Sequence, residues 1–325
     1  MQGYHKHLKP AGFRDKLEIG MTYHNSVLLR EVIESLGVEK EEWYIDCTLG
    51  DGGHSLEILK RGGKVYGIDA DPESLIRVEK RFREGGIEKG NYKLLQGNFG
   101  DIDILIKPAS TAKRGEQTDK ADFKFAGAIF DLGVSSLQLE SPERGFSFGK
   151  MGPLDMRMDP SLGVRAWDLV NNLERKELYE LFYKLGEEKH SKRLADAIVS
   201  AREITPFETT TQLAMVLEKA VGGRKEKIHP ATRVFQALRM MINDEINALE
   251  EGLEKIKEKI KKNGRISIIS FHSLEDRIVK LNFRKWAELG LGQIKTKKPI
   301  VPSEQEVLKN PWSRSAKLRV FEVGV

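Results

Sequence analysis

The feature that most constrains the fold is a short apolar segment that stops at a cluster of glycines, followed by a second apolar segment that ends in an acid. Residues 43–46 precede the glycine-rich residues 50–53, and residues 64–68 run into Asp69. Glycines between a strand and a helix let the backbone approach a ligand closely, and an acid after the next strand accepts hydrogen bonds from ribose hydroxyls. Strand, glycine turn, helix, strand and acid together are typical of a nucleoside-cofactor site.

The same alternation continues along the first half of the chain. Asp71, Pro72 and Glu73 supply an N-cap, a first-turn proline and a first-turn acid, which predict a helix to about residue 83. Residues 92–96 and 125–130 are predicted strands, separated by a polar surface loop at 108–124. Alternating strands and helices predict an α/β fold with a doubly wound, mostly parallel sheet covered on both faces.

After residue 131 the pattern becomes helical. No strand is predicted between residue 141 and about 230, whereas 175–185, 187–202 and 210–220 have helical periodicity. We therefore expect a helical domain at 141–230 inserted between 22–140 and 231–325, with 1–21 as a flexible lead-in. In the last part we expect a long helix with an apolar stripe from Ile242 to Ile260, ended by Asn263 and Gly264. A strand at 265–271, a helix at 274–283 and a hairpin of 293–297 with 318–323 follow.

Composition narrows the class of protein. Among 325 residues, 54 Lys and Arg against 49 Asp and Glu give 54 − 49 = +5, which permits a polyanionic partner without requiring one. Cys47 is the only cysteine, so no disulfide forms within the chain and a reducing compartment is expected. No apolar run is long enough for a membrane span, and no Cys or His spacing indicates a structural metal. We expect a cytoplasmic protein.

Two cofactors compete for the predicted site. A dinucleotide fingerprint needs glycine at its sixth position, but counting from Gly50 that position is Ser55. Asp46, just before the loop, suits the cationic amino group or sulfonium of S-adenosyl-L-methionine better than a pyrophosphate. Asp131 ends the fourth predicted strand, so Asp46, Asp69 and Asp131 are expected to converge where open parallel sheets bind ligands. This favours S-adenosyl-L-methionine, with an NAD-dependent oxidoreductase as the alternative.

Several sequence blocks resemble the signature blocks of the MraW (RsmH) methyltransferases. They are residues 46–54, 131–136, 144–148, 153–159, 229–233 and 270–277, in order between Tyr23 and Glu322. The resemblance implies a class I methyltransferase (Rossmann-like) fold with an inserted helical domain. It also implies methyl transfer from S-adenosyl-L-methionine to N4 of a cytidine in 16S ribosomal RNA, at the decoding centre of the small subunit or a precursor.

The resemblance also assigns cofactor contacts, to which our reading of the residues adds Asp46 and Gly50. The residues that carry over from the family are Gly52, Gly53, His54, Asp69, Phe99, Asp131 and Gln138. Two departures from the family pattern stand out. Asn25 and Ser26 replace a Thr-Pro or similar pair, and Trp312 stands where a basic residue is usual, which weakens a phosphate-binding role for 310–315.

Methylation of a cytosine amine needs a hydrogen-bond acceptor, because the nitrogen lone pair is delocalised into the ring. Asp131 is the first candidate, with cofactor recognition as its alternative role, and Ser135, Asn243 and His272 are further candidates. His272 is equally interpretable as a hydrogen-bonded residue at a strand end, and Ser273 with Asp276 as a helix cap.

RNA binding requires aromatic rings and cations. Phe146 and Phe148 are candidates, with core packing as their alternative. Candidate cations are Arg144, Arg233, Arg239, Arg277, Arg314, Lys317 and Arg319. A non-catalytic RNA-binding ribosome assembly factor that retains a cofactor pocket is the remaining alternative.

Overall fold

The core of the protein is a seven-stranded sheet with the strand order β3-β2-β1-β4-β5-β7-β6. The computed structural model describes residues 23–106, 123–223 and 229–324, so the predicted lead-in at 1–21 and most of the loop at 108–124 lie outside it. The parallel strands are β1 (Trp43–Asp46), β2 (Lys64–Asp69), β3 (Tyr92–Gln96), β4 (Phe125–Asp131) and β5 (Ile260–Ser270). Antiparallel β7 (Lys317–Val323) joins β5 to β6 (Gly292–Ile294), which confirms the predicted terminal hairpin. The chain has the class I methyltransferase fold.

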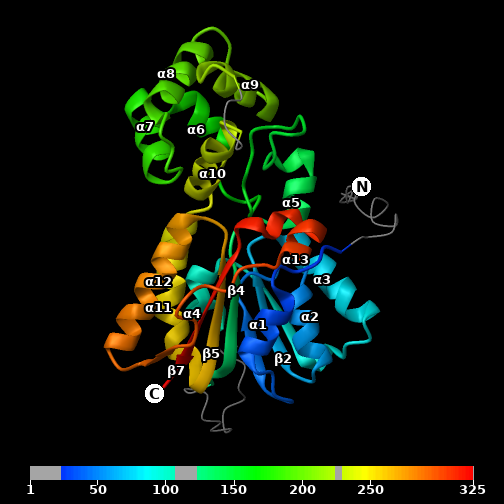
Figure 1. Cartoon of the computed structure of the whole chain (residues 1–325). Coiled ribbons are helices and arrows are strands. Elements are labelled where there is room, and N and C mark those ends of the chain that lie inside the picture. The colour runs from blue at the N-terminus through cyan, green and yellow to red at the C-terminus, as the bar shows by residue number, and fades with distance from the viewer. Residues whose placement is uncertain (1–22, 107–122, 224–228, 325) are drawn as a thin grey trace, which may run out of the picture.

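Helices cover both faces of this sheet (Figure 1). One face packs against α1 (Leu29–Leu36), α2 (Gly53–Lys60) and α3 (Pro72–Glu84), and the other against α4 (Ile102–Leu105), α11 (Glu245–Ile256) and α12 (Ser273–Glu288). Successive strand residues point to opposite faces, so Ile129 joins the first cluster and its neighbour Phe130 the second. Both side chains are fully buried, which explains why β4 reads as a continuous apolar run.

The predicted start of α3 is confirmed. The Asp71 side chain accepts a hydrogen bond from the Glu73 backbone N–H at 3.1 Å, and Pro72 occupies the first turn. This cap fixes the turn directly after β2, next to Asp69, the acid predicted to bind the ribose hydroxyls.

The predicted long helix from Ile242 to Ile260 is confirmed between Glu245 and Ile256, the bounds of α11, but both of its predicted ends are wrong. Asp244 adopts a left-handed conformation with φ 50°, which separates α10 from α11, and the chain becomes extended at Ile260. Ile260 is buried and pairs with Phe125, and the register shifts before Gly127 pairs with Arg265. Asn263 and Gly264 therefore form an irregularity within β5 and do not end a helix. An isoleucine four residues after Ile256 fits a helical stripe and a strand start equally well.

A second group of helices lies beyond the carboxyl end of the sheet (Figure 1). It comprises α6 (Ala166–Asn172), α7 (Arg175–Lys184), α8 (Ser191–Arg202), α9 (Thr210–Ala220) and α10 (Ala231–Ile242). These helices share a hydrophobic cluster of their own that runs from Phe146 to Ile242, so α10 packs with them although it follows residue 230. We propose that this helical part is a separately packed unit.

A core truncation tests that proposal. Phe182 of α7 is fully buried in the helical cluster, so Phe182→Ala is expected to destabilise this part by about 3–5 kcal/mol. Hydrogen exchange should accelerate in α6–α10 and leave the central strands protected. Tyr183→Ala, which removes a neighbouring ring that is 59% exposed, serves as the control and should change little. Equal loss of protection in β4 would contradict a separate unit.

Candidate active site

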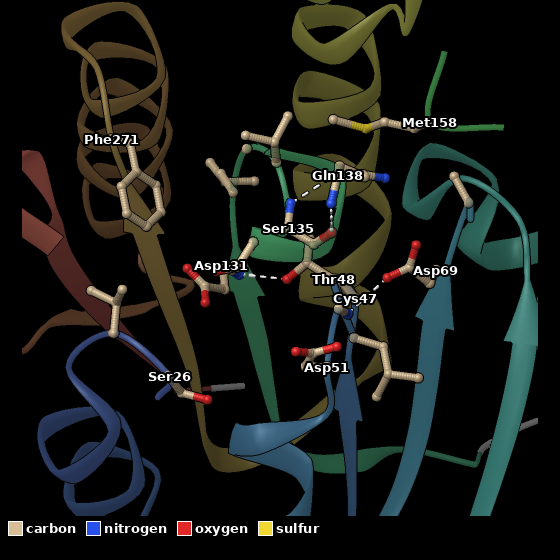
Figure 2. Close-up of a pocket in the computed structure, with 18 of the residues that line it drawn as sticks. Ser26, Cys47, Thr48, Asp51, Asp69, Asp131, Ser135, Gln138, Met158 and Phe271 are labelled. Atoms are coloured by element: carbon tan, nitrogen blue, oxygen red, sulfur yellow. Dashed lines mark hydrogen bonds between the residues drawn. The ribbon is translucent and has the colours of Figure 1, made fainter. Parts of the chain in front are cut away.

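A cleft lies at the carboxyl ends of the parallel strands (Figure 2). It encloses about 1370 Å³ including its opening to solvent. The predicted site residues that line it are Gly50, Gly53, His54, Asp69, Phe99, Asp131, Ser135, Gln138 and Asn243. Asp46, Gly52 and His272 do not line it. The strand ends therefore bring most of the predicted residues together, as expected for an open parallel sheet.

The glycine loop is held in place by Asp69. The Asp69 carboxylate accepts hydrogen bonds from the backbone N–H groups of Gly50 at 2.7 Å and Asp71 at 2.8 Å. Gly50 has φ 51°, a conformation that favours glycine. Burial raises the pKa of Asp69 to about 7, although the two backbone hydrogen bonds act in the opposite direction.

Asp46 lies behind the cleft wall. Its carboxylate accepts hydrogen bonds from the Ser55 hydroxyl at 2.7 Å and from the Thr48 N–H at 3.2 Å, and burial raises its pKa. The neighbouring Gly52 faces α3, where a Cβ would lie 2.9 Å from Val78. The structure thus gives both residues a role in fixing the loop against α2 and α3.

Asp131 and His54 present polar atoms to the cleft. The Asp131 backbone N–H donates to the Thr48 hydroxyl at 2.5 Å, which ties the end of β4 to the loop after β1. Asp131 Oδ2 lies 3.5 Å from His54 Nε2. Asp131 Oδ1 and both His54 ring nitrogens are buried and have no hydrogen-bond partner among the described residues. Buried polar atoms of this kind are normally paired, so they indicate a ligand site.

Ser135 and Gln138 form the capping box of α5 (Ser136–Glu140). The Ser135 hydroxyl accepts from the Gln138 N–H, and Gln138 Oε1 accepts from the Ser135 N–H. Gln138 Nε2 also donates to Asp71 Oδ2 at 3.0 Å. The Gln138 side chain therefore joins the turn after β2 to the turn after β4, on the cleft wall.

The Asn243 side chain forms hydrogen bonds with the surrounding backbone. Its Oδ1 accepts from the Met158 N–H at 2.7 Å, and its Nδ2 donates to the Met156 and Arg239 carbonyls. These bonds hold residues 156–158 against the end of α10, so the structure places Asn243 as a clamp on the cleft wall.

His272 caps α12 beside the cleft. Its Nδ1 accepts from the Glu275 N–H at 3.4 Å, and its Nε2 lies 3.0 Å from Glu275 Oε1. The predicted cap by Ser273 and Asp276 is therefore wrong by one residue, since His272 and Glu275 form the capping box and Asp276 pairs with Arg319. Phe271 and Glu275, on either side of His272, line the cleft.

Many of the predicted RNA-binding cations are already paired with protein groups. Arg239 pairs with Glu245, Arg277 with Glu187, Arg319 and Lys317 with Asp276, and Arg233 lies 3.8 Å from Glu188. Arg144 binds Asp71 and the carbonyls of Arg157 and Met158. Arg314 is exposed.

The two candidate rings pack within the protein. Phe146 is buried in the helical cluster, so the core interpretation is correct for it. Phe148 stacks on His229 with ring centroids 4.7 Å apart. Neither ring is among the residues that line the cleft.

Sequence reasoning missed the part of the cleft formed by residues before α1. His24, Asn25, Ser26 and Val27 line it, and a Cβ on Gly53 would lie 2.0 Å from the Ser26 hydroxyl. Ser26 therefore sits directly on the start of α2. The only sequence signal at this position was the departure from the family pattern at Asn25 and Ser26.

The described residues offer neither a group of side chains for a metal ion nor a helix for a membrane span. Within residues 23–106, 123–223 and 229–324, no group of three or more His, Cys, Asp or Glu side chains is arranged to hold a metal ion. No helix in these segments is long and apolar enough to cross a membrane.

Comparison with known proteins agrees with the sequence resemblance. The model of the MraW methylase family matches residues 21–324. The chain is 46% identical to the ribosomal RNA small subunit methyltransferase H of a Synechococcus species, over 93% of this chain and 92% of the relative. It is 45% identical to the protein of the same name from Deinococcus radiodurans, over 92% and 89%. A solved rRNA methylase from Streptococcus thermophilus aligns with a TM-score of 0.38 and 14% identity, over 92% and 93%.

The raised pKa of Asp69 predicts a pH-dependent stability. The folded state holds this proton up to about pH 7, whereas an unfolded aspartate loses it near pH 4. The stability of the wild type relative to Asp69→Asn should therefore fall as pH rises from about 4 to 7 and stay level above that. Denaturant unfolding of both proteins across this range measures the difference.

The control for this comparison is Asp101→Asn, which alters an exposed carboxylate on the helical turn after β3. This variant measures the effect of removing a carboxylate outside the cleft. A stability difference for Asp69→Asn that stays level between pH 4 and 7 would show that the folded protein does not retain the Asp69 proton.

Proposed function

Because the chain belongs to the MraW methylase family, we propose that it transfers the methyl group of S-adenosyl-L-methionine to N4 of a cytidine in 16S ribosomal RNA. The observation that carries the proposal is the unpartnered Asp131 Oδ1, buried at the end of β4 in the same cleft as the glycine loop and Asp69. The names of the relatives support small-subunit ribosomal RNA as the substrate.

The residues of the cleft fit this cofactor. Asp69 would accept hydrogen bonds from the ribose hydroxyls, and Gly50 leaves room for close approach of the ligand to the backbone. Phe99 offers an aromatic edge to the adenine, and its ring is fixed against Phe130 with centroids 5.5 Å apart. When bound, the cofactor supplies a methyl group on a positively charged sulfur.

The charge of the cleft argues against the NAD alternative. The described lining residues contain neither Lys nor Arg, and five of them are acids. Asp51 pairs with Arg77 and Glu245 with Arg239, whereas Asp69, Asp131 and Glu275 have no Lys or Arg partner among the described residues. A pyrophosphate would bring negative charge among these carboxylates, whereas a sulfonium and an amino group are attracted to them. An oxidoreductase with a dinucleotide cofactor therefore fits this cleft poorly.

Asp131 is the acceptor that the reaction needs. When a carboxylate oxygen accepts a hydrogen bond from the N4 amine, the lone pair of the amine becomes more localised on its nitrogen. The same oxygen is placed to take the proton that the amine loses on methylation. His54 Nε2 lies 3.5 Å from Asp131 Oδ2 and would help to orient the carboxylate towards the amine. Leu132, Val134 and Phe271 line this part of the cleft with apolar surface, which excludes water from the reacting groups.

Product analysis tests the proposed reaction. Protein incubated with radiolabelled S-adenosyl-L-methionine and small ribosomal subunits that lack the modification should place label in N4-methylcytidine after nucleoside digestion. Naked 16S RNA and a precursor particle, tested in parallel, identify the preferred form of the substrate. Absence of label from cytidine, with normal cofactor binding by calorimetry, would favour the non-catalytic assembly factor instead.

Asp131→Asn separates the two roles proposed for this residue. If Asp131 handles the amine proton, kcat should fall by about 100-fold, with little change in the Kd of S-adenosylhomocysteine. The methyl-transfer assay and calorimetry measure the two quantities. A large loss of affinity for S-adenosylhomocysteine, with kcat preserved at saturating cofactor, would assign Asp131 to cofactor recognition instead.

A further inference from the structure

One large aromatic side chain of the cleft is exposed to solvent. Trp312 lines the cleft and keeps 57% of its surface exposed. It lies on the helical turn η6 (Pro311–Ser315), directly before β7. An exposed indole at the mouth of a cleft offers a flat aromatic face to a ligand that enters the cleft.

The turn that carries Trp312 is fixed to the rest of the protein. Ser313 is fully buried, and both its N–H and its hydroxyl donate to the Asn310 carbonyl. Asn310 Nδ2 in turn donates to the Asn25 carbonyl at 3.2 Å, next to the cleft residue Ser26. The ring is therefore presented by a packed turn and needs no rearrangement to be accessible.

The strand order shows how far the start of β7 lies from the cofactor residues. Asp69 ends β2, Asp131 ends β4 two strands further on, and β7 lies another two strands on. At about 4.8 Å per strand, Asp131 is about 10 Å from Asp69 across the sheet and the start of β7 about 19 Å. In S-adenosyl-L-methionine the sulfur is attached directly to the ribose C5′. A cofactor with its ribose on Asp69 therefore delivers its methyl group near β1 and β4.

The cleft beyond β4 is therefore left for the methyl acceptor. Phe271, which follows β5, lines this region (Figure 2). Its ring lies 3.8 Å from the position that a Cβ on Gly133 would take. A cytosine with its amine at Asp131 would extend towards Phe271, and the next nucleotide of the strand would reach the rim of the cleft. Trp312 lines the same cleft and is exposed on its rim.

We infer that Trp312 stacks on an unpaired base of the RNA next to the target cytidine, and this inference rests on the proposed function. Single-stranded RNA is gripped by aromatic stacking together with cations at the phosphates. Lys309 and Arg314 flank Trp312 on the same surface segment, both are exposed, and neither has an ion-pair partner within the described parts of the chain. In this arrangement the Trp312 ring would stack on the base, and Lys309 and Arg314 would pair with the neighbouring phosphates.

Kinetics of Trp312→Ala test the inference. Loss of one stacked base should raise KM for the RNA about tenfold, with kcat and the Kd of S-adenosylhomocysteine nearly unchanged. Trp312→Phe should recover most of the affinity because a benzene ring still stacks. Leu308→Ala is the matched control, because Leu308 is 82% exposed on α13 (Glu304–Lys309) and does not line the cleft.

Fluorescence gives a readout that a structural role would not alter. A single-stranded oligonucleotide containing the target cytidine should quench tryptophan emission when S-adenosylhomocysteine is bound, and Trp312→Phe should abolish the quenching although three tryptophans remain of four. An unchanged KM in Trp312→Ala, undiminished quenching in Trp312→Phe, or a large loss of S-adenosylhomocysteine affinity would each overturn the inference. Failure of the proposed function is a different result, since the wild type would then label no cytidine.

Discussion

The structure depends on carboxylates that hold the glycine loop at the ends of neighbouring strands. Asp69 binds the Gly50 N–H from β2, and Asp46 binds Ser55 at the start of α2. The loop after β1 is thereby held from both sides, and the left-handed Gly50 places no side chain in the cleft. A carboxylate has about four acceptor positions, so Asp69 can hold the loop and still accept from a ligand.

The helical part is connected to this edge through Arg144. Its guanidinium binds the Asp71 carboxylate at 2.7 Å and, on its other side, the carbonyls of Arg157 and Met158. Asn243 holds the same segment from α10. The cap of α3, the cleft residue Met158 and the helical cluster therefore form one hydrogen-bonded chain. A displacement of the helical part would therefore shift the turn at Asp71, which follows Asp69.

The sequence was sufficient for the parts of this protein that local patterns determine. The strands β1 to β4, the Asp71 cap and the placement of Asp69 and Asp131 at strand ends follow from apolar runs bounded by turn residues. Tertiary contacts decided the rest. Ile260 belongs to a strand because Phe125 pairs with it, and Asp46 is withdrawn from the cleft because Ser55 reaches it. Ser26 and Trp312 enter the cleft through contacts between distant segments, which no local pattern reveals.

The charge of the cleft also limits how RNA is bound in the proposed reaction. Three acids of the lining, Asp69, Asp131 and Glu275, have no Lys or Arg partner among the described residues, so a phosphate backbone is repelled from the interior. Lys309 and Arg314 are not among the lining residues and lie on the segment that carries Trp312. Only a base is compatible with the interior, which requires the target nucleotide to leave its stack while its phosphates remain outside. The energy lost on unstacking has to be recovered by contacts with the protein. An exposed aromatic ring at the rim provides such a contact without bringing any phosphate near the carboxylates.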